Sequence, residues 1–380
     1  MDLKVFSFIL FLIVFFSFEK CCFSKEDNKF LSDQIKILES ELKTHGQAET
    51  DDLFLDFNSE TLLNDVTSGK GIVDYSALLN RVSSIFFAEL MLTFRLGVKL
   101  VASIFIISFI GSLKSSFHES KISDIAYFCG YIIMAVMLYD VIQMGILMTR
   151  QVVDNSFSLV YSSFPLLIMF MASSGNIASA GVIKPFFIFS FTLLFTLLKD
   201  FLLPLVFFQV GIAFVSNFTN KINLSQMGSF IKQITLWSMG IFLTLFSGIL
   251  SLQGSLGYSV DGMTARTAKL AIVSGIPFAG RYMADASDTI VGYSLMLKNS
   301  AGFMIMIALL SICAIPVIKM IVWCLFFKVL AVVGSIMPDT RFSSLLNDVA
   351  GVFFLMVAII ASILIMVYVM IAFIVSKGVG

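Results

Sequence analysis

Residues 257–300 carry charged side chains at helical spacing on both sides of a proline turn. These residues are Asp261, Arg266, Lys269, Asp285 and Asp288. Because Ser274-Gly275-Ile276-Pro277 interrupts the helical pattern, we expect two amphipathic helices whose cations and carboxylates can meet across a hairpin. Two interpretations fit equally: a re-entrant hairpin fixed by ion pairs at the membrane interface, or a charged face that lines an aqueous passage or subunit seam.

Three further polar residues interrupt long apolar runs. Asn176 lies among small residues that recur every four positions, a pattern typical of close helix packing with a hydrogen bond across the contact; a substrate or pore contact is the alternative. Lys199 and Asp200 are neighbours in sequence, so they do not face each other on a helix. They indicate either an interfacial break or a charged element beside a water-filled path.

The sequence lacks the motifs that catalysis, cofactor binding or metal binding would need. In the topology predicted from the sequence, His45 and His118, the 2 histidines, lie on opposite sides of a membrane and cannot share a metal site or a catalytic triad. No phosphate-binding loop and no compact basic patch occur. We therefore expect no enzyme, no catalytic residues, no cofactor, no metal and no nucleic-acid partner.

The composition places these polar groups in a membrane protein. The 380 residues are 58% hydrophobic and 13% charged, about half the charged content of a soluble protein, which excludes a soluble enzyme. Several apolar runs reach or approach the ~18 residues of a membrane helix. They are Leu96–Leu113, Ile125–Met148, Phe157–Val182, Pro185–Val215, Ile231–Leu256, Ala301–Met337 and Val349–Val375. We predict an all-α polytopic integral membrane protein with about seven spans, in a range of six to nine.

Two of these runs are longer than a ~30 Å apolar slab requires at ~1.5 Å per residue. Pro185–Val215 is interrupted by a central charged pair and by Pro204, and Ala301–Met337 is interrupted by Pro316. Each run is expected to form a long tilted helix, a kinked helix or a re-entrant hairpin. The basic character of residues 221–232 favours a hairpin for the first run, because cations prefer the cytoplasmic side.

The N-terminal part differs from the rest of the chain. Residues 1–90 hold 8 basic and 15 acidic residues (−7), whereas residues 91–380 hold 17 and 10 (+7). Val5–Phe18 is an apolar stretch of about 14 residues, typical of a signal sequence and too short to span a bilayer. We predict a signal peptide at 1–24 (an uncleaved anchor is the alternative), an exported acidic helical segment at 25–90 and a membrane domain at 91–380.

Several segments together resemble the stage III sporulation protein AE family. They are Asp261–Lys269, Ile276–Gly280, Ser287–Gly292 and Leu297–Gly302, supported by Ser123–Phe128, Leu197–Leu205 and Lys232–Trp237. The resemblance extends from roughly residue 90 to the C-terminus. Each segment is weak alone, and their combination is specific.

The resemblance implies a multi-pass membrane component, without enzymatic activity, of the mother cell–forespore channel complex, a secretion-like assembly needed for late forespore gene expression. Its implied partners are other stage III sporulation A-operon proteins, the lipid bilayer and, indirectly, stage II sporulation protein Q from the forespore. Its implied location is the outer forespore membrane, with the exported segment facing the intermembrane space. The alternative is a stand-alone secondary transporter, which would often show paired inverted repeats around broken helices.

Overall fold

The computed structural model describes helical stretches within residues 83–106 and the continuous ranges 120–173, 177–218, 225–275, 280–335 and 341–376; for residues 252–300 and some positions near helix ends it describes the backbone alone. The helices are α6 (Ser120–Ser173), α7 (Ile177–Leu197), the π-helical turn η1 (Leu198–Leu202), α8 (Leu203–Phe218), α9 (Ser225–Gly275), α10 (Gly280–Gly334) and α11 (Arg341–Ser376). No strand occurs in these ranges, so the all-α prediction is confirmed for the described part of the chain.

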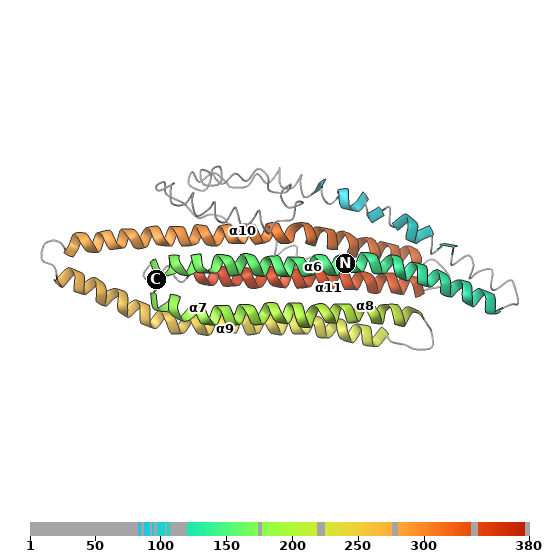
Figure 1. Ribbon diagram of the computed structural model, residues 1–380, viewed down its shortest axis with the longest axis horizontal. Helices are drawn as coiled ribbons and strands as arrows, with labels where there is room; N and C mark the ends of the chain where they lie inside the picture. The colour runs from blue at the N-terminus through green and yellow to red at the C-terminus, as the bar shows by residue number, and fades with distance from the viewer. Residues whose placement is uncertain are drawn as a thin grey trace.

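The helices form an elongated antiparallel bundle with α11 at its centre (Figure 1). α11 packs against α6, α8, α9 and α10, and its contact with α10 is the most extensive in the bundle. In its most apolar part 67% of the residues are buried, against 22% in α9. The nearly uniform apolar sequence of α11 follows from this position, because a helix surrounded by other helices is apolar on all sides.

Five described helices are long and apolar enough to cross a membrane: Phe128–Met169, Lys184–Phe218, Gln226–Ser251, Ala301–Gly334 and Arg341–Ile374. A membrane protein is therefore supported, whereas the count of seven spans is not confirmed. The signal peptide, most of the exported segment and much of the expected Leu96–Leu113 span lie outside the described residues.

The prediction of separate spans at Ile125–Met148 and Phe157–Val182 is wrong, because α6 runs unbroken through the polar residues between them. Those residues find partners without ending the helix. The Thr149 hydroxyl donates to the carbonyl of Gly145 one turn earlier (2.9 Å), and Ser156 is buried with its Oγ 3.9 Å from the Cys313 thiol. Polar side chains satisfied in this way do not require a loop.

The hairpin expected for Pro185–Val215 is also wrong, because α7, η1 and α8 form one continuous helix. Proline has no N–H, and its ring conflicts with the carbonyl four residues earlier, which here belongs to Asp200. The π-helical turn relieves this conflict, since the Leu203 N–H bonds to the carbonyl of Leu198 instead of Lys199. The chain thereby passes Pro204 without breaking.

α9 and α10 are 51 and 55 residues long, about 80 Å each at ~1.5 Å per residue. α10 continues through Pro316 as a single helix. The helix–turn–helix predicted for residues 257–300 is present, but its arms are the ends of α9 and α10 and not a separate re-entrant hairpin. Figure 1 shows these arms projecting past the ends of α6, α7 and α11.

Candidate functional site

An ion pair joins two candidate membrane spans far from their ends. Lys199 Nζ lies 2.5 Å from Asp154 Oδ1, linking η1 to α6. The two side chains are 33% and 46% exposed on the outside of the bundle. Ionisable groups at membrane depth are costly, and they usually face a protein contact or a water-filled cavity. This pair is therefore the strongest candidate functional site among the described residues.

The π-helical turn positions the lysine. Its first and last residues, Leu198 and Leu202, are fully buried in the core, while Asp200 and Phe201 are exposed. The inserted residue shifts the helix face locally, so that Lys199 meets Asp154 on the neighbouring helix. Single π turns within α-helices are frequent at functional sites.

The ion pair continues a polar band along the exposed face of α6. The polar band comprises Asp140, Gln143, Leu147, Arg150 and Asp154, which are all exposed. Their spacing of three and four residues keeps them on one side of the helix. Because this side holds carboxylates, a guanidinium and an amide, its chemistry suits water, lipid headgroups or a polar protein contact better than lipid tails.

A second polar cluster lies partly buried between helices. Asn217 Nδ2 donates to Asp348 Oδ2 (2.8 Å) and to the carbonyl of Ala213 (2.7 Å), which connects α8 to α11. Lys232 of α9 extends over the ring of Phe354, with Nζ 5.7 Å from the ring centroid. Gly351 lies beside this ammonium, and a Cβ there would be in ordinary van der Waals contact with Nζ at 3.6 Å. The cluster fastens α8, α9 and α11 together.

The structure brings only part of the predicted site together. Lys199 pairs with Asp154 rather than with its sequence neighbour Asp200, which is exposed beside it. Asn176 lies outside the described residues. The remaining residues fall on the projecting arms, where only the backbone is described: Asp261, Arg266 and Lys269 on α9, and Asp285 and Asp288 on α10. Their pairing across the hairpin stays a prediction.

Sequence reasoning missed Asp154, Asn217 and Asp348. Asp154 falls between two of the spans predicted from the sequence, and the other two lie just beyond the ends of apolar runs. The available signal was the helical spacing of Asp140, Arg150 and Asp154, which continues across the supposed loop.

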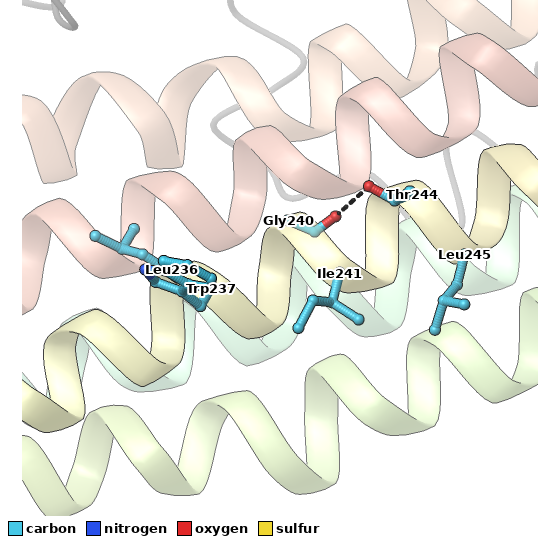
Figure 2. A pocket seen from close by; sticks show the side chains of 6 residues that line it. All are labelled: Leu236, Trp237, Gly240, Ile241, Thr244 and Leu245. Atoms are coloured by element: carbon cyan, nitrogen blue, oxygen red, sulfur yellow. Dashed lines mark hydrogen bonds between the residues drawn. The ribbon is translucent and has the colours of Figure 1, made fainter.

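A shallow apolar groove lies on the outer face of α9, lined by Leu236, Trp237, Gly240, Ile241, Thr244 and Leu245. Figure 2 shows its polar hydroxyl turned back onto the helix, where Thr244 Oγ1 donates to the carbonyl of Gly240 (2.8 Å). The groove offers no ionisable group. Among the described residues, no cluster of three or more His, Cys, Asp or Glu could hold a metal ion.

Comparisons with known proteins identify the family. The family profile of stage III sporulation protein AE matches residues 57–378. Stage III sporulation protein AE of Bacillus subtilis (strain 168) is 29% identical over 238 residues, which cover 63% of this chain and 59% of that protein. The matched part is thus less than two thirds of the relative's length. No solved structure matches the chain. The chain belongs to the stage III sporulation protein AE family.

Proposed function

We propose that this chain is a membrane component of a channel or secretion-like complex that links mother cell and forespore and supports late forespore gene expression. The observation that carries the proposal is the family match over residues 57–378. The five candidate spans and the charged pair between two of them agree with a role in the membrane. The proposed role is assembly or conduction, without an enzymatic step.

The proposed location is the outer forespore membrane, with residues 25–90 exported into the intermembrane space. The proposed partners are other stage III sporulation A-operon proteins and, indirectly, stage II sporulation protein Q. The acidic excess of residues 1–90 (8 basic against 15 acidic) would then lie where partner domains can bind it.

The transporter alternative rests on broken helices in the two long runs. Both runs are continuous helices in the described chain, with a π-helical turn as the interruption in one of them. No observation therefore favours a stand-alone transporter over a component of a complex.

Deletion of the gene in its endospore-forming host tests the proposal. A fluorescent reporter of late forespore transcription should fail after engulfment in the deletion strain, and a copy of the gene expressed in the mother cell should restore it. Reporter activity equal to that of the parent strain would overturn the proposal. Expression of the same copy only in the forespore is the control, and it should not rescue the reporter.

A further inference from the structure

We propose that α8, α9 and α11 enclose a water-binding site, which lies against Gly351 and between the side chains of Gln209 and Lys232. Its ligand is one or a few water molecules, which complete the hydrogen bonds of Gln209, Lys232 and Asp348. The site is formed within one chain, so it needs no partner protein and does not depend on the proposed function.

The Gln209 amide is a buried polar group without a protein partner. Gln209 lies on α8 and is 6% exposed. Its Oε1 is closed off from solvent and has no hydrogen-bond partner among the described residues. An unpaired buried polar group costs about 1–3 kcal/mol, and such groups almost always bind either protein atoms or ordered water. Water bound at this amide removes the cost.

Lys232 on α9 brings a second group with unused hydrogen-bonding capacity to the same place. Its ammonium lies 5.7 Å from the centroid of the Phe354 ring, a contact that attracts the positive charge. Within the described part of the chain, however, the ammonium makes no ion pair and donates no hydrogen bond. Because an ammonium has three N–H donors, water is needed to satisfy them.

Gly351 of α11 is buried, and it brings the two groups to one point. A Cβ built on Gly351 would lie 3.6 Å from Lys232 Nζ and 4.0 Å from Gln209 Nε2. Apart from the neighbouring residues and the backbone of α11, no other described atom lies within 4 Å of that position. The space beside Gly351 thus admits a methyl group and is lined by two nitrogens. A water molecule is smaller than a methyl group, and a polar lining favours water over a dry cavity.

The charges around this space favour a neutral ligand. Asp348 lies one turn before Gly351 on α11, and one of its carboxylate oxygens accepts from Asn217. Since Lys232 and Asp348 carry opposite charges, the site has no net charge that would attract an ion. Water can accept from Lys232 and Gln209 and donate to the carboxylate, which makes the about three hydrogen bonds typical of a buried water. With the amide turned over, the water donates to its oxygen instead.

Water can reach the site from the nearby end of the bundle. Asn217 is the residue before the last of α8, and Lys232 and Asp348 lie about two turns from the first residues of α9 and α11. A hydrated site at this end lets three helices meet at charged side chains without the full cost of placing those charges in a dry contact.

Water-edited solid-state NMR of the full chain in deuterated liposomes tests the proposal. With glutamine side chains labelled by nitrogen-15, the Gln209 signal is identified by its loss in Gln209→Glu. Magnetisation from water should reach the Gln209 amide at mixing times that leave the backbone amide of the fully buried Phe353 unpolarised. Gly351→Ala fills the space with a methyl group and should slow the transfer several-fold. The matched control is Gly240→Ala on the outer face of α9, which should leave the rate unchanged.

Gln209→Met separates a hydrated amide from a dry one, because methionine has a similar length and no amide. Loss of bound water should lower the midpoint of thermal unfolding in detergent by a few degrees, whereas removal of an unpaired amide from a dry site would raise it. A raised or unchanged midpoint overturns the proposal. So does slow transfer in the unaltered chain, or a rate that Gly351→Ala does not change. Slow transfer with a lowered midpoint would assign the amide to a direct bond with Lys232, which also overturns it.

Discussion

α6 and α9 are both more than 50 residues long, and each presents one side to the outside of the bundle. The outer side of α9 is apolar and grooved, whereas the outer side of α6 carries charges through the middle of a candidate span. Both helices pack on α11 with their other side. The difference shows that hydropathy alone does not identify the surroundings of a membrane helix, since both helices are long and apolar enough to cross a membrane.

The largest expected effect comes from placing one charge on each outer face. Leu245→Lys should reduce membrane-integrated protein, because a lysine inside a lipid-facing helix costs up to the ~2.5–3.5 kcal/mol that applies at the helix centre. Leu147→Lys, at a similarly exposed leucine of the polar band, should be tolerated. Quantitative membrane fractionation of both variants measures the effect. Equal losses would remove the distinction between the two faces.

Substitutions at two glycines compare the packed inner side of α6 with the open outer side of α9. A Cβ at Gly145 would lie 2.8 Å from Phe353 Cε1, and that ring is fixed by stacking on Phe327 and by an edge contact with Trp323. Gly145→Ala should therefore destabilise the chain by about 1–3 kcal/mol.

The matched control is Gly240→Ala, since nothing lies within 4 Å of a Cβ at Gly240. This variant should be neutral or gain up to about 1 kcal/mol from helix propensity. Thermal unfolding of both variants in detergent measures the difference. A lower midpoint for Gly240→Ala would indicate that α9 is covered at this position.

The cluster of Asn217, Asp348 and Lys232 should respond to loss of its carboxylate. Asp348→Ala removes one of the two acceptors of the buried Asn217 amide and should cost about 1–3 kcal/mol, because one of its N–H groups then loses its acceptor. Asp348→Asn keeps an acceptor oxygen and should recover most of the stability. Chemical unfolding in detergent compares the variants, and the same loss in both would assign the effect to the charge and not to the hydrogen bond.

The smallest expected effect on stability is at the exposed ion pair. Lys199→Gln should change stability by at most about 1 kcal/mol, because a partly exposed ion pair is weakly stabilising. The double variant Lys199→Asp/Asp154→Lys exchanges the two charges. It should match the unaltered chain both in stability and in rescue of the reporter. A loss of several kcal/mol in Lys199→Gln would instead place the pair in lipid or in a dry contact.

The helical membrane class could be predicted because the apolar content excludes a soluble fold. Lys199 and Asp200 could also be identified, since they interrupt a long apolar run. The partner of Lys199 could not, because the pairing depends on the π-helical turn before Pro204 and on the packing of α7 against α6. Span boundaries failed at Thr149 and Ser156 because neither side chain ends α6: Thr149 bonds to a carbonyl of its own helix, and Ser156 lies beside Cys313, a neighbour that only the fold supplies.

The accessibility of two spin labels tests the central contrast most directly. Labels at Leu147→Cys and Leu245→Cys, in the cysteine-free full chain reconstituted into liposomes, are compared for relaxation by a water-soluble nickel chelate and by oxygen, which concentrates in the lipid. The nickel chelate should dominate at position 147 and oxygen at position 245. Dominance of oxygen at both positions would contradict the account, because the charged face of α6 would then lie in lipid.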